Sequence, residues 1–395
     1  MKIVSFIGTG NYQPVYYYQN DKSRYIKTEY FIVAAEEFFK PDEIILLLTQ
    51  EAMEKHIDIL LPKIKTSCVK QILIPAGKTE DELWSIFSLI AEQVNDKESI
   101  IIDVTHGFRT QPMLVLAAAV FLKVIKNISV EKIVYGAFEA RDNENYAPVF
   151  DLTPFLRIIE WSSATEQFLN YGNTLQLSNI LYSEHERLIK YEKPEKFSSL
   201  KKFAKIISDL TNSLSLIRPE EVSLISKKMP LIVDDLKVKF NNIAAVKPLG
   251  MLLNKIPESL NSLSLSKNEL FTKKGFFAQS QMISFYLETR QYPQAITLLR
   301  ESIVSLLCII ESFDVWDKAG REKAETMLFD LSSNCRSGKQ IDGKKGKLAA
   351  IWSEICNCRN DVNHAGMRKS ASGAESLIKR TEKLCKRGIE IINAG

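Results

Sequence analysis

An arginine, an asparagine and a histidine late in the chain have the types and spacing that phosphodiester chemistry requires. Arg359, Asn360 and His364 lie in the segment CNCRNDVNHAG, which ends at a glycine. Arginine holds a phosphate through a planar fork of donors, and histidine moves protons near neutral pH. The three residues predict metal-free cleavage of a phosphodiester, with a ribose 2′-hydroxyl as nucleophile. The alternative is a helix end with a solvated arginine and a capping histidine.

A second polar segment, DVTHGFRTQP at residues 103–112, follows an apolar run and precedes a helical pattern. Pro112 suits the first turn of a helix, where the backbone N–H groups have no partner in the helix. Such a helix start binds anions. The groups that we expect to converge on this anion site are Thr105, His106, Gly107 and Arg109.

Two glycines follow the first apolar run, in the sequence Gly8-Thr9-Gly10-Asn11. A dinucleotide-binding fold needs a third glycine and a helix directly after such a turn. Here an aromatic loop, Tyr12 to Tyr18, follows, and no helix is expected before about Glu29. The nicotinamide interpretation is therefore disfavoured. The tyrosines either form a buried loop face or stack on bases.

Apolar runs of strand length alternate with helical patterns over the first 152 residues. Because near-continuous apolar strands between helices are typical of parallel sheets, we predict an α/β sheet covered on both faces. Ligands of such sheets bind beyond the carboxyl ends of the strands. The predicted strands are 2–7, 43–49, 69–74, 99–105 and 131–137, with 146–152 returning as a hairpin at the sheet edge, and the predicted helices are 29–39, 50–61, 80–95 and 112–126.

The remainder of the chain, from about residue 153, lacks strand alternation and is predicted to be all-helical. Residues 153–275 read as a helical connector, split by prolines and Ser/Asn stretches. Residues 276–395 read as a second helical domain. In it we expect Arg300 and Glu301 to form an ion pair, residues 337–347 to form a Gly/Lys-rich loop, and a helix over 348–358 to position Arg359.

Composition indicates a soluble globular protein of two or three domains, with 45% hydrophobic and 25% charged residues in 395 positions. The sequence has no apolar run near 18 residues, so no membrane span is expected, and the amino terminus does not read as a signal peptide. Six scattered cysteines without zinc-ligand spacing predict a reduced, cytoplasmic chain without bound metal.

Charge is divided unevenly along the chain. Residues 1–150 hold 16 Lys and Arg against 20 Asp and Glu, whereas the remainder has a net charge of +8. Residues 336–369 carry eight cations and three anions. A basic surface beside the Arg/His segment fits a polyanionic substrate, although a solvated Lys-rich loop gives the same count.

The first 160 residues resemble the CRISPR-associated Rossmann-fold (CARF) sensor domain, in the branch with a DxTHGFR loop. The segments FIGTGNY, EIILLLTQEA, DVTHGFRTQP, YGAFEA and VFDLTPFL carry the resemblance. The later segments YPQAITLLRE and RNDVNHAG resemble the HEPN ribonuclease domain, an all-helical fold marked by an arginine, a polar residue and a histidine. The two ends together resemble the CARF–HEPN ribonucleases of type III CRISPR systems, whereas the connector matches poorly.

The resemblance implies a homodimeric, cytoplasmic, single-stranded RNA endonuclease with Arg359, Asn360 and His364 as catalytic residues. It implies no cofactor or metal, but an allosteric activator, cyclic oligoadenylate, with cyclic tetra-adenylate favoured. Carried over by position, the activator would contact Gly8, Thr9, Gly10, Asn11, Thr49, Thr105, His106, Gly107 and Arg109.

Five residues turn an ideal helix about 140° beyond a full turn, so Arg359 and His364 would point in different directions on one unbroken helix. Either the helix loosens near Asn363 and Gly366, or two chains pool their motifs. Two other functions stay open. One is a non-catalytic sensor that binds RNA or a partner, and the other is a sensor domain that itself cleaves the cyclic activator.

Overall fold

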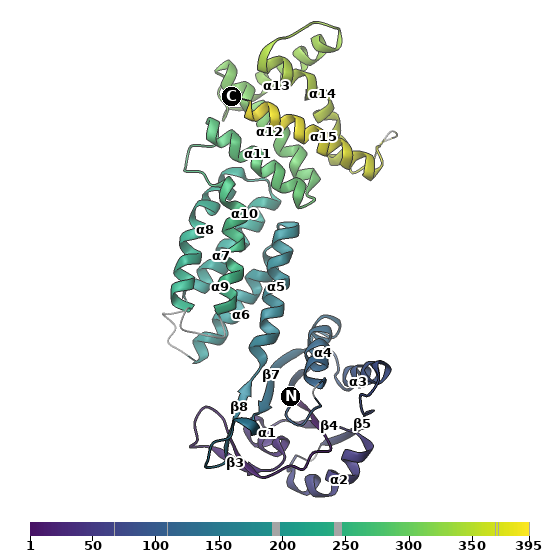
Figure 1. The fold of residues 1–395 in the computed structure, drawn as a ribbon. Helices are drawn as coiled ribbons and strands as arrows, with labels where there is room; N and C mark the ends of the chain where they lie inside the picture. Colours follow the sequence, from purple (N-terminus) through teal and green to yellow (C-terminus); the bar gives the residue numbers. More distant parts are fainter. Residues whose placement is uncertain are drawn as a thin grey trace. The chain divides into compact units, whose positions relative to one another are not determined.

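The computed structural model describes residues 1–395 except positions 67, 109, 192–197, 241–246, 368, 370 and 395. The chain divides into two compact units, Met1–Ile159 and Glu160–Gly395. Figure 1 colours the first unit from purple to blue and the second from blue to yellow. The predicted boundary between residues 275 and 276 falls inside the second unit and stays a prediction.

The first unit contains an eight-stranded mixed sheet, ordered β3-β2-β8-β7-β6-β1-β4-β5 in its described residues. The five strands from β7 to β5 in that order are parallel, whereas β8 is antiparallel to β7 and β3 is antiparallel to β2. This architecture confirms the predicted Rossmann-like α/β class. The strands are β1 (Lys2–Ile7), β2 (Val15–Tyr18), β3 (Tyr25–Thr28), β4 (Glu43–Leu48), β5 (Val69–Leu73), β6 (Ser99–Asp103), β7 (Ser129–Gly136) and β8 (Tyr146–Asp151).

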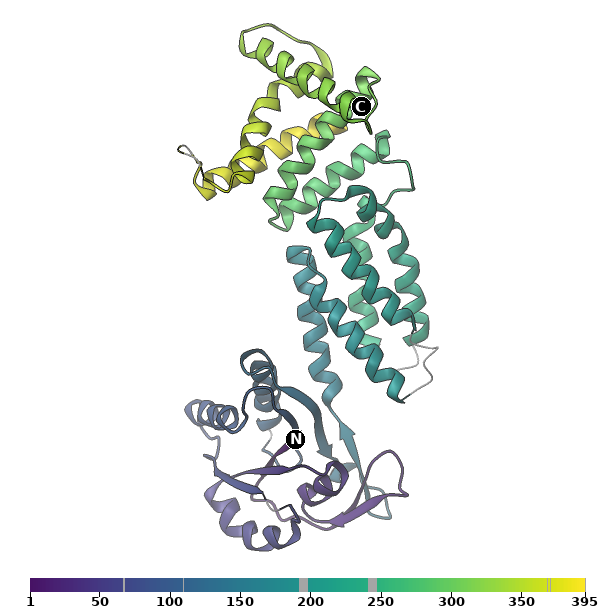
Figure 2. The same cartoon turned by 180° about the vertical axis from the view of Figure 1, so that it is seen from behind.

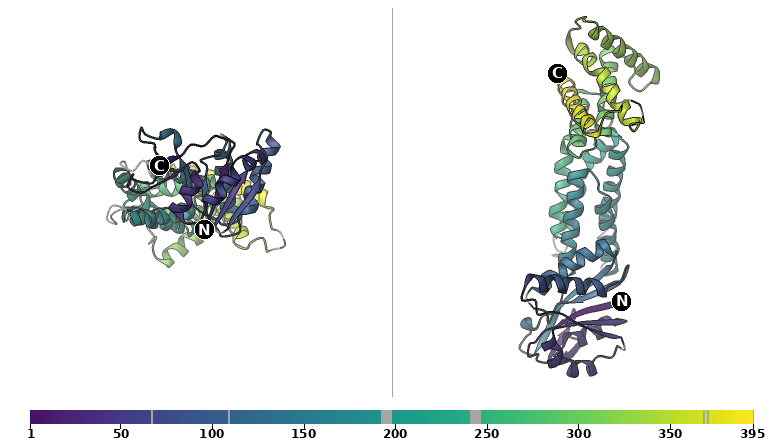
Figure 3. Two further views of the ribbon diagram at one scale, coloured as in Figure 1. Left: turned by 90° about the horizontal axis from the view of Figure 1, so that it is seen from below. Right: turned by 90° about the vertical axis from the view of Figure 1, so that its right-hand side faces the viewer.

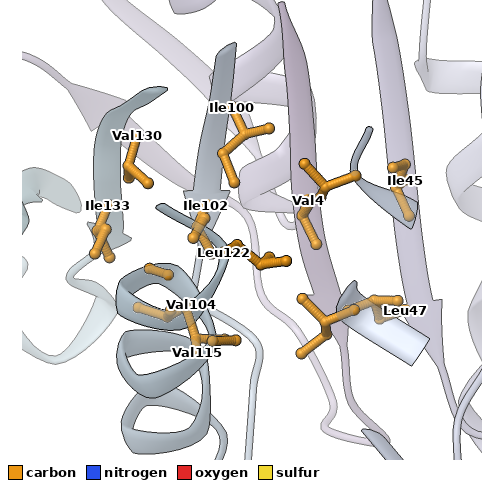
Figure 4. Close-up of a cluster of buried hydrophobic side chains, with 14 of the residues drawn as sticks. Val4, Ile45, Leu47, Ile100, Ile102, Val104, Val115, Leu122, Val130 and Ile133 are labelled. Carbon is orange, nitrogen blue, oxygen red and sulfur yellow. The ribbon is translucent and has the colours of Figure 1, made fainter. Parts of the chain in front are cut away.

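Four helices cover the two faces of this sheet. Helices α1 (Phe31–Phe39) and α2 (Gln50–Leu60) pack on one face. Helices α3 (Glu80–Gln93) and α4 (Gln111–Ile125) pack on the other, where Val115 and Leu122 of α4 meet Val4, Ile102 and their neighbours (Figure 4). Burial of each such side chain contributes roughly 1.5–3 kcal/mol. The central strands are therefore fixed, and with them the loops at their carboxyl ends.

The aromatic segment after the glycine turn differs from the prediction. The sequence predicts a loop there, but residues 15–18 form β2, which pairs with β8 and with β3. Val15 and Tyr17 are buried while Tyr16 and Tyr18 face outward. Because tyrosines lie on both faces of the strand, the sequence does not show the alternation of apolar and polar residues that marks a strand. As a result β8 is not at the sheet edge, although its antiparallel return against β7 is as predicted.

The second unit is helical in its described residues, which confirms the predicted class. Helices α6, α7 and α8 run side by side (Figures 2 and 3). Helix α5, which begins in the first unit, buries Trp161 and Phe168 in the second. The helices are α5 (Thr153–Tyr171), α6 (Leu175–Tyr191), α7 (Ser198–Ser215), α8 (Pro219–Phe240), α9 (Lys247–Leu253), α10 (Lys255–Leu260), α11 (Lys273–Glu288), α12 (Tyr292–Glu311), α13 (Lys318–Arg336), α14 (Gly343–Asn363) and α15 (Ala374–Asn393).

Two features near the carboxyl end were not predicted. Helix α13 buries a narrow stripe of mostly small residues, Gly320, Ala324, Leu328 and Ser332, which gives little hydrophobic signal. Helix α14 begins at Gly343, not at residue 348. The Gly/Lys-rich sequence reads as a loop, but a side chain at Gly346 would lie 1.8 Å from the Ile341 carbonyl oxygen. The glycine therefore lets the helix start pack against that backbone.

Helix α12 is long and apolar enough to cross a membrane, with a mean hydropathy of 1.5 over its most apolar window. No such run is expected from the sequence. However, 61% of that window is buried inside the protein, and the core helices of folded domains share this composition.

Candidate functional site

The predicted ligand residues lie in loops that follow three neighbouring parallel strands. Residues 8–11 follow β1, Thr49 follows β4, and residues 105–107 follow β6. Because the carboxyl ends of adjacent parallel strands share one edge of the sheet, the topology brings these loops together. The backbone confirms their proximity, since a side chain at Gly8 would lie 2.8 Å from the His106 carbonyl oxygen. Arg109 lies outside the described residues.

A buried carboxyl holds the loop after β6 against β1. Asp103 is fully buried and accepts hydrogen bonds from the Ser5 hydroxyl (2.6 Å) and the Thr105 backbone N–H (2.8 Å). Burial raises the pKa of Asp103 to about 6. The Thr105 hydroxyl in turn accepts from the Gly136 N–H at 2.8 Å, which joins the loop to the end of β7. Thr105 is therefore engaged in the framework of the site.

His106 caps the start of α1. Its Nε2 accepts a hydrogen bond from the Phe31 backbone N–H at 3.1 Å. Burial lowers the pKa of His106 to about 3, so the imidazole is neutral at physiological pH. Because Nε2 is the acceptor, the proton of the neutral ring is on Nδ1. The side chain keeps one donor for a ligand, and it does not bring a positive charge.

Tyr12 lies over the glycine turn, a role that the sequence did not reveal. Its ring centroid is 4.0 Å from that of His106 and 4.8 Å from that of His56. Its hydroxyl donates to the Gly8 carbonyl oxygen (2.8 Å) and accepts from the Gly8 N–H (2.9 Å). Burial raises the pKa of Tyr12 to about 12, so the hydroxyl keeps the proton that it donates.

His56 and Lys55 on α2 are further residues of this edge that the sequence reading missed. The buried His56 shares a 3.0 Å hydrogen bond with the Tyr30 hydroxyl through Nδ1, and burial lowers the pKa of its imidazole. The exposed Lys55 donates to the Thr9 carbonyl oxygen at 2.8 Å. Both residues follow Thr49 by less than two helical turns, a spacing that could have indicated their place at the strand ends.

Two other predicted ligand residues have structural partners. The Thr49 hydroxyl, which is buried, caps α2 by accepting from the Ala52 N–H. A side chain at Gly107 would meet the Gln111 side-chain oxygen at 2.9 Å, and that oxygen accepts from the Phe108 N–H. Gln111 therefore closes the loop at the first residue of α4, and the predicted helix start directly after this loop is confirmed.

The predicted catalytic residues lie at the end of α14. The helix continues without a break to Asn363, and His364 is its C-cap, with its backbone N–H bonded to the Asn360 carbonyl oxygen at 2.9 Å. The chain then turns through left-handed conformations at Ala365 (φ 52°) and Gly366 (φ 69°). Loosening begins only after His364, so Arg359 and His364 point to different sides of a regular helix.

Arg359 is half-buried and lies above Asn363. With the Asn363 amide oxygen turned toward it, the guanidinium Nε donates at 3.0 Å. Arg359 also approaches the Asn360 side-chain oxygen at 3.5 Å. His364 is exposed, and its imidazole makes no hydrogen bond with the residues that the structure describes. The two catalytic candidates are thus accessible, but neither contacts the other.

An ion-pair network supports the face of α14 that carries Arg359. Arg300 pairs with Glu301 (2.5 Å), as predicted, and with Glu325 of α13 (2.9 Å). Its guanidinium lies 5.3 Å from the centroid of the Trp352 ring on α14. The network therefore joins α12, α13 and α14 one to two turns before the motif.

The opposite side of the motif packs against the start of α15. Asp361 is buried and accepts from the Ser372 N–H at 3.1 Å, and the Cys358 thiol lies 3.3 Å from the Thr381 hydroxyl. A cavity of about 320 Å³ lies on this side, between Tyr292, Val362, Gly366 and Leu377. No group of three or more metal-ligating side chains is found among the described residues.

Comparison with known proteins identifies relatives of the first unit and of the chain as a whole. Residues 2–139 match the family model described as the CARF domain of the CRISPR system endoribonuclease Csx1. The chain is also similar to the CRISPR-associated protein MJ1674 of Methanocaldococcus jannaschii, with 26% identity over 326 residues. That match covers 80% of this chain and 46% of the relative, so the chain spans about half the length of the curated protein that it matches. The two matches support a CRISPR-associated protein whose N-terminal unit is a CARF domain.

Proposed function

We propose that this chain is a metal-independent endoribonuclease of type III CRISPR defence that cyclic oligoadenylate activates. The proposal depends above all on one observation, the accessible Arg359 and His364 at the end of α14 in a chain that begins with a CARF domain. CARF domains bind cyclic oligoadenylate, and the matched family is named for an endoribonuclease. The second helical domain, residues 276–395, is then a HEPN ribonuclease domain of the CARF–HEPN type.

The activator would lie on the loops that follow β1, β4 and β6. Backbone N–H groups of residues 9–11, the start of α4 and the Nδ1–H of His106 are donors for phosphate and ribose oxygens. Lys55 adds a positive charge beside Thr9. These groups favour an uncharged or anionic ligand with many acceptors, which fits a cyclic oligonucleotide.

The cleavage step needs no group beyond the RNA and this chain. The ribose 2′-oxygen attacks the adjacent phosphorus and loses its proton, while the bond from phosphorus to the 5′-oxygen breaks and that oxygen gains a proton. His364 moves one of these protons. Arg359 stabilises the charge on the phosphate, and Asn360 orients the phosphate or the histidine. The products are a 2′,3′-cyclic phosphate and a 5′-hydroxyl.

A homodimer would supply the geometry that one chain lacks. Because Arg359 and His364 point to different sides of α14, a single copy does not present both to one phosphate. In a two-fold dimer the arginine of one copy can face the histidine of the other. Helix α4 offers a surface for such pairing, since it is apolar on all sides and Met113, Phe121 and Val124 are exposed along it.

The deciding experiment is RNA cleavage in EDTA, with and without cyclic tri-, tetra- and hexa-adenylate. We expect cleavage in the presence of one ring size and cyclic-phosphate ends on the products. Strict dependence on Mg²⁺ or Mn²⁺ would require another mechanism. Ring binding without cleavage under any condition would favour the alternative of a non-catalytic sensor.

A second alternative, cleavage of the activator by the sensor itself, would use Thr9, Thr105 and His106 to position a 2′-hydroxyl. Thr105 Oγ1 and His106 Nε2 already accept backbone hydrogen bonds, which argues against their acting as proton acceptors. Incubation of labelled cyclic tetra-adenylate with the protein tests this alternative directly.

A further inference from the structure

The hydroxyl of Tyr12 occupies two backbone groups that a ligand of the strand-end site would need. Gly8 presents its N–H and its carbonyl oxygen to the same point, and the hydroxyl bonds to both, at 2.9 and 2.8 Å. A donor and an acceptor are thus directed together at one small polar group. Gly8 itself is buried, so a ligand that bonds to this pair would take the place of the Tyr12 hydroxyl.

Aromatic and imidazole rings from three other segments surround the Tyr12 ring. His106 after β6 and His56 on α2 lie at ring-centroid distances of 4.0 and 4.8 Å, and Tyr30 makes an edge contact at 5.6 Å. Both imidazoles are neutral, because burial lowers the pKa of each. A cage of neutral rings favours a flat aromatic group over a phosphate.

The two glycines of the turn leave room for the Tyr12 side chain. A side chain at Gly10 would lie 3.1 Å from the Tyr12 ring, and one at Gly8 would lie 3.3 Å from its hydroxyl. The resemblance to CARF domains implies that these glycines contact the activator. In the structure, Gly10 accommodates the Tyr12 ring, and Gly8 accommodates the Tyr12 hydroxyl together with the His106 backbone.

We propose that Tyr12 occupies a nucleobase pocket in the ligand-free sensor and that an adenine of the activator displaces it. The N6 amino group and N1 of adenine form an adjacent donor and acceptor, the pattern that the Gly8 carbonyl oxygen and N–H require. The purine would lie where the Tyr12 ring lies, against His56 and His106. This inference rests on the proposed function and specifies which group reads the base.

Competition between tyrosine and base gives a clear expectation. If a ligand binds only when Tyr12 has moved, its apparent dissociation constant is the constant for the open pocket divided by the fraction of molecules in which the pocket is open. Tyr12→Phe keeps the ring but removes both hydrogen bonds that hold it closed. We expect the dissociation constant for cyclic tetra-adenylate to fall roughly 5- to 30-fold in this variant.

The experiment measures binding by calorimetry in the full chain and in two variants, Tyr12→Phe and Tyr16→Phe. Tyr16 is the matched control, because it lies on the outer face of β2, stacked on Tyr146. Each protein is titrated with cyclic tetra-adenylate and with the same ring built from purine riboside, which lacks the N6 amino donor. Melting temperatures verify that both variants fold.

The inference holds if three results are obtained. Tyr12→Phe binds cyclic tetra-adenylate more tightly than the wild type does, and Tyr16→Phe does not. Tyr12→Phe also binds the purine riboside ring more weakly than it binds cyclic tetra-adenylate. Equal or weaker binding of the adenine ring by Tyr12→Phe would overturn the displacement, because the hydroxyl would then be neutral or a ligand contact. If Tyr12→Phe binds cyclic tetra-adenylate and the purine riboside ring with equal affinity, the Gly8 carbonyl oxygen does not recognise the N6 amino group. Activation of RNA cleavage by the ring in the wild type would leave the proposed function standing in both cases. Absence of binding of cyclic tri-, tetra- and hexa-adenylate by the wild type and by both variants would remove the proposed function as well.

Discussion

The strand-end site and the end of α14 differ in how many of their polar groups have hydrogen-bond partners within the protein. At the strand ends, Thr49, Thr105, His106 and the Gly8 backbone all have partners within the protein. At the end of α14, His364 is exposed, and within the part of the chain that the structure describes Arg359 approaches two side-chain amides. A ligand at the first site must compete with internal bonds, whereas the second site is open but incomplete in one copy. The contrast fits a switch in the first unit and chemistry in the second.

The largest effect expected is the loss of cleavage on removal of either catalytic side chain. His364→Ala and Arg359→Ala should each lower the rate of RNA cleavage by roughly 10³-fold or more. Melting temperatures should stay nearly unchanged, because such polar groups at a helix end rarely decide stability. Lys318→Ala, which removes an exposed cation at the start of α13, is the control and should cleave like the wild type. Wild-type cleavage by His364→Ala would end the assignment.

Mixing the two inactive variants tests whether the site is shared between copies. If Arg359 of one chain acts with His364 of the other, a dimer of one His364→Ala chain and one Arg359→Ala chain contains one intact site. Random exchange then restores about a quarter of the wild-type rate. The measurement is RNA cleavage after the mixed variants have been allowed to exchange subunits. If no activity returns although mixed dimers form, each site belongs to a single chain.

The buried carboxyl of the strand-end site predicts an unusual pH dependence. The pKa of Asp103 is raised from 3.8 to about 6 in the folded protein. Between these values the folded state binds more protons than the unfolded state, so the contribution of Asp103 to stability is present below pH 3.8 and is lost as the pH rises through 6. The loss amounts to about 3 kcal/mol over the whole window.

Comparison with Asp103→Asn isolates this contribution from other titrating groups. Chemical unfolding of the two proteins from pH 4 to pH 7.5 should show the wild type losing stability relative to the variant as the pH rises. A constant difference across this range would mean that Asp103 ionises in its ordinary range despite its burial.

Gly8 lies in crowded surroundings and Gly373 in open ones, so replacement of each by alanine should affect stability differently. A side chain at Gly8 would meet the backbone oxygen of His106 at 2.8 Å, whereas Gly373 has no atom within 4 Å and a φ of −62°. Gly8→Ala should lower the free energy of unfolding by about 1–3 kcal/mol, and Gly373→Ala should leave it unchanged or raise it slightly. Thermal unfolding of both variants measures the difference. Equal effects would mean that the glycine turn can shift away from the loop after β6.

The sequence predicts those parts of the sites whose contacts form between residues close together in the chain. The strands β1, β4 and β6 are readable because each is a nearly continuous apolar run, and the loop after β6 is readable because Pro112 marks a helix start. The place of Tyr12 is not readable, since its neighbours Tyr30 and His106 come from other segments, whereas the spacing of His56 from Thr49 does point to the strand ends. The opposed directions of Arg359 and His364 follow from helix geometry alone. Where α14 begins could not be predicted, because it depends on how Gly346 packs against Ile341.

The smallest effect expected concerns Lys55, which connects α2 to the glycine turn through the Thr9 carbonyl oxygen. Its side chain is exposed, so Lys55→Ala should leave the melting temperature nearly unchanged. If the strand ends bind a polyanionic activator, loss of this charge should raise the half-maximal activator concentration roughly 3- to 10-fold at low salt. Because salt screens exposed charges, the ratio should shrink toward one as ionic strength rises. Lys70→Ala is the matched control, because Lys70 is exposed on the edge strand β5. The measurement is a titration of cyclic tetra-adenylate against RNA cleavage at two salt concentrations. Equal responses of the Lys55 and Lys70 variants would place the activator's phosphates away from the start of α2.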